Sequence, residues 1–133
     1  MADSFNFELV SPERLLLSAA VAEIVLPGME GEMTVMANYA PTMTTIRPGM
    51  LTVKEASGQS RKFVVFGGFA DIVPSGCTVL AESAIAVSDF KKDALAKRVD
   101  QAKADLAAAQ SDEAKTRISQ LIADLGNLAS VAA

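Results

Sequence analysis

Glu30 and Glu32 are the residues whose type and spacing come closest to a chemical site in this sequence. Two carboxylates this close can act as general acid and base, or bind a divalent cation. No histidine occurs among the 133 residues, which removes the usual imidazole base and the usual zinc ligand. With no third ligand nearby, an enzymatic or metal role for the pair is the weaker interpretation, and we expect no metal site.

Other familiar catalytic patterns are excluded or absent. Without histidine the chain cannot hold a Ser-His-Asp triad, a Cys-His pair or an HExxH zinc site. Cys77 is the single cysteine, so it forms no internal disulfide, and we expect a small buried thiol there. Gly67 and Gly68 are followed by Phe69, which does not make a phosphate-binding loop. The sequence therefore predicts no catalytic residue.

Five of the six methionines lie between residues 27 and 50, around and behind the two glutamates. One interpretation is structural, with Gly28 and Gly31 forming a tight turn between strands and the methionines filling a core. The other is a contact surface, because methionine adapts to a partner and an acidic loop steers toward basic groups. Residue type alone leaves the two interpretations open.

The composition changes near Val87 and predicts two domains, residues 1–87 and residues 88–133. All five prolines and seven of the eight glycines precede the change, whereas 12 alanines and no proline follow it. Residues 1–87 hold nine acidic and five basic side chains, and the rest of the chain holds seven of each. The net charge of −4 therefore comes from the first domain.

Short strands are expected in the first domain. Apolar and polar residues alternate over residues 5–9 and again over residues 51–54, which is typical of strands with one buried face. The turn-forming stretches at 55–60 and 74–76 each predict a hairpin. Many short strands separated by Gly and Pro favour an antiparallel β-sandwich.

The second domain has the pattern of an antiparallel two-helix hairpin, in which apolar residues recur at intervals of four and three. These residues are Leu95, Val99, Ala102, Leu106 and Ala109, then Ala114, Ile118, Leu121, Leu125 and Leu128. Ser88 and Asp89 are expected to cap the first helix, and the stretch Ser111-Asp112-Glu113 offers an N-cap for the second. Because alanine-rich stripes bury little area, we expect the hairpin to dock weakly and to be mobile.

Location and nucleic-acid binding follow from charge and hydropathy. No run of about 18 apolar residues exists to span a bilayer. Asp3 stands where a secretory signal would carry positive charge, so a cytosolic protein is expected. A net charge of −4, without basic residues interleaved with aromatics, argues against a nucleic-acid partner.

The order of motifs along the chain resembles one family. PGxxGE at 27–32 is followed by Ala-Pro at 40–41 and TxIxPGM at 44–50. FGGFADI at 66–72 and TVLAESAI at 78–85 come next, before the alanine-rich segments. Over essentially its whole length the sequence resembles the epsilon subunit of the F-type ATP synthase, a central-stalk family with a β-sandwich and a two-helix domain.

The resemblance implies a non-catalytic rotor subunit that couples the gamma subunit to the membrane-embedded c ring during ATP synthesis. It would be peripheral, on the bacterial cytoplasmic face of the inner membrane, and would meet the membrane only through the c ring. The residues that match the family's c-ring contact are Met29, Glu30, Gly31 and Glu32. Those that match its gamma contact are Tyr39, Ala40, Pro41 and Thr44.

The resemblance also implies regulation, in which the helical hairpin reaches the alpha-beta catalytic head and inhibits ATP hydrolysis. The basic residues available for such contacts are Lys97, Arg98, Lys103, Lys115 and Arg117. We hold this as a hypothesis, because acidic side chains are equally numerous in this domain.

Two departures from the family pattern change its expected details. Some bacterial relatives bind ATP through an aliphatic residue, Asp, two free positions and Arg, but here Lys91 and Ala94 replace the acid and the arginine. Without the guanidinium we expect weak or no ATP binding, and no cofactor. Asn38 and Tyr39 stand where relatives usually have Gly-His, which changes the expected gamma contact.

Two other classes of function remain as alternatives. One is a free-standing β-sandwich ligand-binding module with a helical tail, which would need exposed aromatic side chains on a sheet face. Only Tyr39 is expected to be displayed, since the other aromatics are Phe in apolar or alternating segments. The other is a small enzyme that uses Glu30 and Glu32.

Overall fold

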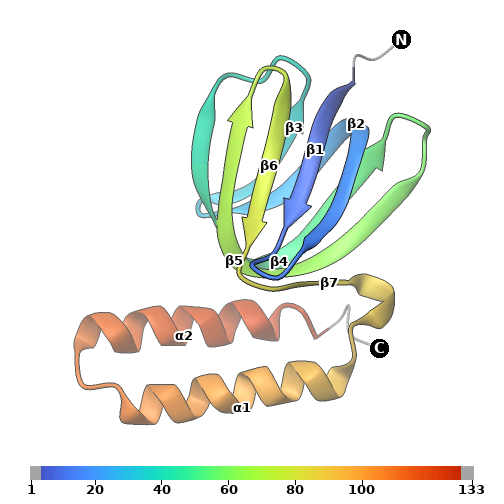
Figure 1. Ribbon diagram of the computed structural model, residues 1–133. Coiled ribbons are helices and arrows are strands. Elements are labelled where there is room, and N and C mark those ends of the chain that lie inside the picture. Colours follow the sequence, from blue (N-terminus) through green and yellow to red (C-terminus); the bar gives the residue numbers. More distant parts are fainter. Residues whose placement is uncertain (1–3, 130–133) are drawn as a thin grey trace. The chain divides into compact units, whose positions relative to one another are not determined.

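The computed structural model describes residues 4–129, which form a strand-rich unit followed by two helices (Figure 1). The chain divides into two compact units between Ala86 and Val87. The strands are β1 (Phe5–Val10), β2 (Leu15–Gly28), β3 (Gly31–Met36), β4 (Thr42–Glu55), β5 (Ser60–Val73), β6 (Gly76–Ala81) and β7 (Ala84–Ala86). The helices are α1 (Lys92–Ala108) and α2 (Asp112–Gly126).

The strand unit is the predicted β-sandwich, and its strands close into a ring. Neighbours in the order β1, β6, β5, β4, β2 pair with one another, and β1 also pairs with β2. β3 continues the sheet from β2, and β7 pairs with β5. All of these pairs are antiparallel except β1 with β6, which is parallel. Alternation along single strands could not reveal that parallel pair, because it joins residues about 70 positions apart.

Both hairpins predicted from turn residues are confirmed. β4 and β5 pair along their length from Lys54 with Ser60 onward, and β5 and β6 pair from Val73 with Gly76 onward. Between β5 and β6 only Pro74 and Ser75 remain outside the strands. The two hairpins set β4, β5 and β6 side by side, and Figure 1 shows them bending together across the unit.

Strand β5 changes its inward-facing side at mid-length. Val65 is buried in the core, and so is Ala70, five positions later, although strict alternation would have turned Phe69 inward. Gly67 and Gly68 lie at the change with φ of 110° and 137°, which a side chain rarely allows. At the two glycines the strand therefore reverses which of its residues face the core, so Phe69 faces outward.

The core of the strand unit collects the inward side chains of all six long strands. The largest fully buried ones include Phe7, Leu9, Ile24, Leu26 and Leu51. Burying each such side chain contributes about 1.5 to 3 kcal/mol. Cys77 is buried among them, as predicted, and is a free thiol.

The helical unit is the predicted antiparallel hairpin (Figure 1). Along α1, Leu95 and Ala102 are buried, and along α2 the stripe continues to Leu125. Ser111 caps α2 as predicted, because its hydroxyl accepts a hydrogen bond from the amide of Ala114 at 3.1 Å. Asp124 is also buried and accepts a hydrogen bond from Gln120 Nε2 at 3.0 Å, which the apolar pattern did not predict.

The predicted cap of the first helix is wrong. Ser88 and Asp89 belong to a 3₁₀ turn, Val87–Asp89, and α1 begins only at Lys92. The N-cap position is Lys91, whose side chain makes no capping hydrogen bond. The reason is the buried Phe90, whose amide donates to the carbonyl of Val87 at 3.1 Å, so the chain completes a tight turn before the helix starts.

Candidate partner-binding surface

The β2–β3 hairpin carries the predicted acidic loop at its tip. Gly28 and Gly31 form the last pair of the two strands, so Met29 and Glu30 make the two-residue turn. Gly31 has a φ of 136°, and a Cβ on Gly28 would lie 3.0 Å from both the Gly31 carbonyl oxygen and Met33 Sδ. The positive φ of Gly31 and the close contacts at Gly28 both favour glycine at these two positions. The structural interpretation of the two glycines is therefore confirmed.

The tip projects its side chains outward. Met29, Glu30 and Glu32 are all exposed, and Glu32 lies opposite Pro27. No cluster of three metal-binding side chains is found among residues 4–129, so the pair gains no further ligand there. The arrangement suits contact with a partner, since an apolar side chain and two acids stand at the end of a rigid hairpin.

The segment that follows β3 is held by backbone hydrogen bonds. The amide of Tyr39 donates to the carbonyl of Met36 at 3.2 Å, and the amide of Asn38 donates to the carbonyl of Pro74 at 3.0 Å. Asn38 has a φ of 64°, the left-handed region that Gly and Asn tolerate best. Asn is therefore one of the few residues that can hold this position without strain.

The four residues that match the gamma contact differ in exposure. Ala40 and Pro41 are exposed, but Tyr39 is only half-exposed and its side chain packs against the core. The expectation that Tyr39 is displayed is therefore corrected, because the ring covers core side chains. Thr44 is half-buried and lies on the side of β4 that Ile46 turns into the core.

The structure separates the two predicted contact segments. Met29 to Glu32 lie at one end of β3 and Tyr39 to Pro41 follow its other end, whereas Thr44 is two residues from Ile46, which pairs with Gly28 beside the tip. A six-residue strand spans roughly 20 Å, so one small partner group cannot touch both segments. Two distinct contacts are geometrically possible.

Sequence reasoning missed an exposed apolar row on the outside of the strand unit. Leu15 pairs with Val10, Val10 with Leu80, and Leu80 with Phe69. Leu15, Leu80 and Phe69 are 53%, 52% and 55% exposed. On β4, Met43 is 72% exposed close by. Alternation after the turn at 74–76 could have predicted that Leu80 faces outward. The outward position of Phe69 could not be predicted in this way, because it depends on the change of face at Gly67 and Gly68.

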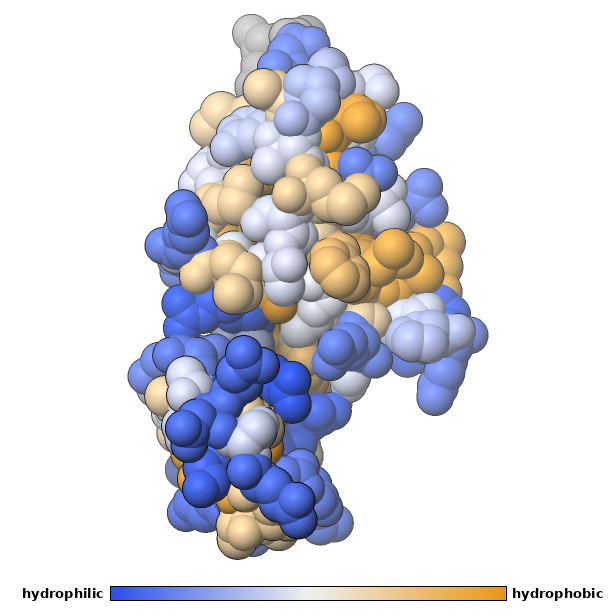
Figure 2. All heavy atoms as spheres, turned by 90° about the vertical axis from the view of Figure 1, so that its left-hand side faces the viewer, coloured by the Kyte–Doolittle hydropathy of each residue, from blue (hydrophilic) through white to orange (hydrophobic). Residues whose placement is uncertain are grey.

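This row borders a shallow apolar hollow of about 400 Å³. Its lining includes Val10, Pro12, Phe69 and Leu80. In Figure 2, apolar surface gathers over the strand unit, and its right-hand patch lies on the side that faces the viewer in Figure 1, where β1, β6 and β5 run. Exposed apolar surface of this kind marks an interaction site more often than a scattered leucine does.

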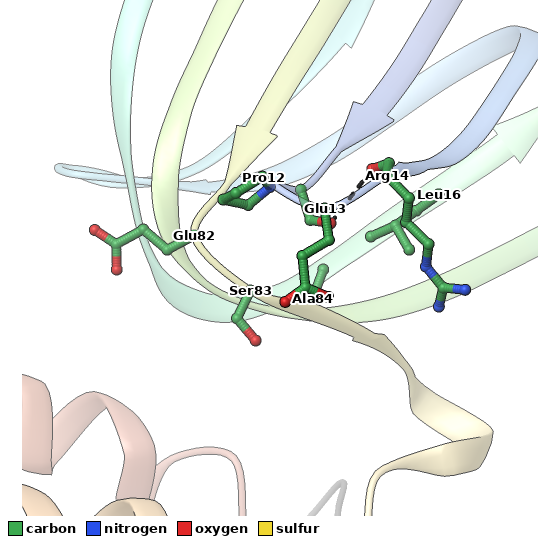
Figure 3. Close-up of a pocket in the computed structure, with 8 residues that line it drawn as sticks. Pro12, Glu13, Arg14, Leu16, Glu82, Ser83 and Ala84 are labelled. Atoms are coloured by element: carbon green, nitrogen blue, oxygen red, sulfur yellow. Dashed lines mark hydrogen bonds between the residues drawn. The ribbon is translucent and has the colours of Figure 1, made fainter.

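A second hollow, of about 200 Å³, is polar but lacks a catalytic arrangement (Figure 3). Glu13, Arg14 and Glu82 line it, yet Figure 3 shows Glu82 and Arg14 pointing away on opposite sides of Glu13. At the edge of this hollow the Ser11 hydroxyl donates to the carbonyl of Arg14 at 3.3 Å. Charged groups that diverge in this way cannot act together on one substrate atom.

The two ionisable groups with shifted pKa values, among residues 4–129, are not members of the two predicted contact segments. Burial raises the pKa of the Cys77 thiol to about 12, and the Asp71 carboxylate adds to the rise. Such a thiol is inert as a nucleophile. Partial burial of the guanidinium also lowers the pKa of Arg98 in α1, although the residue as a whole is exposed.

The basic residues expected to be regulatory all lie on the helices and are all exposed. They are Lys97, Arg98, Lys103, Lys115 and Arg117. Lys91 and Ala94, at the start of α1, are exposed as well.

The fold and its exposed surfaces define a β-sandwich with a helical hairpin whose displayed features suit binding to other chains. The sequence profile of the ATP synthase delta/epsilon chain β-sandwich domain matches residues 4–87. The chain is 58% identical over 131 residues to the ATP synthase epsilon chain of Sinorhizobium medicae, covering 98% of this chain and 97% of that one. It is 59% identical over 128 residues to the ATP synthase epsilon chain of Rhizobium etli, and the match covers 96% of this chain and 95% of that one. The chain therefore belongs to the ATP synthase delta/epsilon chain family.

Solved structures show the same fold at lower identity. A chain of the Euglena gracilis mitochondrial ATP synthase, solved with OSCP, F1 and c ring, superposes with a TM-score of 0.75 at 22% identity, covering 96% of this chain and 80% of that chain. A chain from the structure of the central stalk and c ring of the Tetrahymena thermophila mitochondrial ATP synthase superposes with a TM-score of 0.58 at 15% identity. This match covers 69% of this chain and 73% of that chain. At these identities the likeness concerns the fold alone.

Proposed function

We propose that this chain is a non-catalytic central-stalk subunit of a proton-driven ATP synthase, in which it couples the gamma subunit to the c ring. The observation that carries the proposal is the similarity to epsilon chains over 96 to 98% of the sequence, which takes in both structural units. A relative that shared only the β-sandwich would support a binding domain and no more.

The β2–β3 hairpin tip is the proposed c-ring contact. Met29, Glu30, Gly31 and Glu32 match the family segment that meets the polar loops of the ring. The exposed tip supports this role, because the paired strands β2 and β3 hold it at their end and its side chains are exposed. Acidic groups on a rigid tip attract basic groups of a partner and orient it.

The segment after β3 is the proposed gamma contact. Ala40 and Pro41 can touch gamma directly, since both are exposed. Tyr39 and Thr44 are half-buried, so their larger contribution is to hold the segment in place. Because Tyr39 to Pro41 and the hairpin tip lie at opposite ends of β3, the subunit can bind shaft and ring together.

Absence of catalysis and peripheral location belong to the same proposal. The chain catalyses no step itself, and the alpha-beta head forms ATP. It lies at the cytoplasmic face of a bacterial inner membrane and meets the membrane only through the c ring. No helix among residues 4–129 is long and apolar enough to cross a bilayer.

The helical hairpin is proposed to regulate ATP hydrolysis by contacting the catalytic head through its exposed basic residues. ATP itself is not its ligand, because Ala94 cannot supply the bidentate donor that the family pattern uses for phosphate. A binding isotherm with micromolar affinity for ATP would contradict this part of the proposal.

Binding to the gamma-containing catalytic sector, purified without its own epsilon chain, tests the function. We expect tight one-to-one binding by calorimetry. The double variant Glu30→Gln, Glu32→Gln should bind the isolated sector like the wild type, yet bind the complete synthase with its c ring several-fold more weakly. No binding of the wild-type chain to either preparation would overturn the proposed function.

The exposed Phe69 is the observation that favours the alternative, a free-standing ligand-binding module. The same binding experiment separates the two functions, because a free-standing module would not bind the catalytic sector. A small enzyme using Glu30 and Glu32 is tested by assaying the chain alone for ATP hydrolysis beside the same double Gln variant. Equal and negligible rates are expected.

A further inference from the structure

The base of the β2–β3 hairpin is attached to β4 by an irregular stretch of pairing. The two strands pair at Val25 with Thr52 and again at Gly28 with Ile46, and the regular register breaks in between. Two residues of β2 lie between these pairs, whereas five residues of β4 do. β4 therefore bulges opposite β2 just before the tip of the hairpin.

The ring of Pro27 lies at this bulge. Proline has no amide hydrogen, so β2 donates no backbone hydrogen bond at this residue. A Cβ built on Gly49 would lie 2.7 Å from Pro27 Cβ and 3.0 Å from its Cγ, which places the ring directly against the Gly49 backbone. The next nearest atom, the carbonyl oxygen of Arg47, is 3.8 Å away. A side chain at position 49 would therefore collide with the proline ring.

Neither side of this contact can move aside easily. The proline ring is closed onto its own backbone, so it cannot rotate away as a flexible side chain can. On its other side β4 stays in register with β5, where Gly49 pairs with the buried Val65. Groups packed this closely have no free volume to move into. The Pro27–Gly49 contact therefore fixes the end of β2 relative to β4.

The orientation of the tip depends on this contact, because β3 is an edge strand. Among residues 4–129, β3 pairs with β2 alone. A two-stranded ribbon twists more readily than a wider sheet. The pair of Gly28 with Ile46 and the Pro27–Gly49 contact attach this ribbon to β4 at the end nearest the tip.

We propose that Pro27 and Gly49 are positioning residues for the c-ring contact: their packing holds the two-residue tip at a fixed angle to the sheet, so that Glu30 and Glu32 face the ring. The inference rests on the proposed function. In this role neither positioning residue needs to touch the ring itself. A tip that is already ordered loses little conformational entropy on binding, which raises its affinity.

Binding of the full-length chain to two preparations tests this role. One is the complete synthase with its c ring and the other is the isolated catalytic sector, both stripped of their own epsilon chain. Gly49→Ala should weaken binding to the complete synthase several-fold and leave binding to the sector unchanged, because the displaced ring turns the tip away from the c ring. Gly58→Ala is the matched control in the turn between β4 and β5, where a Cβ has no atom of the described chain within 4 Å. It should leave both affinities unchanged.

A compensating variant separates positioning from a general loss of stability. Pro27→Gly removes the ring without creating a clash, so it should fold, and it should weaken binding to the complete synthase alone. Combining Pro27→Gly with Gly49→Ala returns a methyl group to the contact, so this double variant should bind the complete synthase more tightly than either single variant. In the Gly49→Ala background, Glu30→Gln with Glu32→Gln should lower the affinity by a smaller factor than in the wild type, because the misplaced acids no longer face their partners.

Three results would contradict the positioning role, and they can be told apart. If the single variants bind the complete synthase like the wild type, or lose affinity for both preparations equally, the positioning role is overturned and the proposed function stands. If the wild type binds the two preparations with equal affinity, the c-ring contact is overturned and the positioning role with it. If the wild type binds neither, the proposed function itself fails.

Discussion

Gly68 is the residue that matters most for the change of face in β5. The outward position of Phe69 depends on that change. A Cβ at this position would lie 2.0 Å from the carbonyl oxygen of Leu80 and 2.9 Å from Ala81 Cα. Both are backbone atoms, so they cannot move aside as a flexible side chain would. We expect Gly68→Ala to lower the free energy of unfolding by roughly 3 kcal/mol or more.

Gly58 provides the control, because it also has a positive φ, of 99°, but has no atom near a built Cβ. Gly58→Ala should lower the free energy of unfolding by about 1 to 2 kcal/mol, from backbone conformation alone. Tyr39, the single tyrosine in a chain without tryptophan, reports on unfolding of the strand unit in urea. Equal losses in the two variants would show that the clash at Gly68 is not what matters.

Cys77 makes stability depend on alkaline pH. Burial, with the Asp71 carboxylate as a second cause, raises the thiol pKa from 9.0 to about 12. The folded state therefore holds a proton that the unfolded state releases, so the contribution is complete below pH 9 and is lost as pH rises toward 12. The free energy of unfolding should fall by up to about 1.4 kcal/mol per pH unit in this window.

Cys77→Ala isolates that effect from the titration of lysine and tyrosine. The variant should be less stable than the wild type at pH 7, because it leaves a small cavity, but the difference should shrink between pH 9 and pH 11. Urea unfolding at a series of pH values measures it. A difference that stays constant would mean that the thiol titrates normally in the folded protein.

At the level of elements, the two helices begin in different ways. Helix α2 has a side-chain cap, the 3.1 Å bond from the Ala114 amide to Ser111 Oγ, whereas Lys91 provides none for α1. Ser111→Ala should therefore destabilise the helical unit by about 1 kcal/mol. Lys91→Asp should stabilise it by a similar amount, because Asp can cap the helix and suits its dipole.

Thermal unfolding followed by circular dichroism at 222 nm measures both changes. Lys91→Ala is the neutral control, since it removes a side chain that makes no capping bond. If Ser111→Ala and Lys91→Ala were equally destabilising, the hydrogen bond at Ser111 would contribute nothing in solution.

Local pattern was enough to predict the elements but not how they are assembled. Alternation, turn residues and the four-three spacing predicted the strands, the hairpins and both helical stripes, because each depends on neighbours in sequence. The parallel β1–β6 pair could not be predicted this way, since it joins segments far apart in the chain. The first helix cap was misplaced because Phe90 is buried and holds the chain in a 3₁₀ turn.

The candidate surface shows the same limit. The tip at Met29 and Glu30 could be predicted, because glycines at both ends of a two-residue turn are a local signal. The half-buried state of Tyr39 could not, since it depends on which core side chains the ring covers. The outward position of Phe69 depends on the two glycines in β5, where the alternation of inward and outward side chains breaks. The expectation that Tyr39 alone among the aromatic side chains is displayed therefore missed Phe69.

For the whole molecule, the division into two compact units leads to a deletion experiment. The strand unit closes its own ring and core before Val87, so a chain ending at residue 87 should stay folded and still bind the catalytic sector. Without residues 88–133, ATP hydrolysis by the assembled enzyme should rise, because the proposed inhibitory contacts are gone. Steady-state hydrolysis, with equal occupancy of the two forms, measures this.

An unchanged rate would remove the regulatory role while leaving the stalk function intact. A narrower variant, with Lys97, Lys103, Lys115 and Arg117 changed to Gln, keeps the helices and should reproduce part of the increase. If the deletion raised the rate and this variant did not, the inhibition would depend on the bulk of the hairpin and not on its charge.

The position of β1 between β2 and β6 has a consequence for how the protein is made. β1 leaves the ribosome before the other strands of the unit, yet one of its two neighbours, β6, ends at Ala81. The ring therefore cannot close until β6 has been synthesised, and contacts this distant in sequence form slowly. Until then β1 exposes one unpaired edge, and the nascent chain is most open to aggregation during that interval. The helical segment is synthesised last, so the strand unit can finish folding before the hairpin exists.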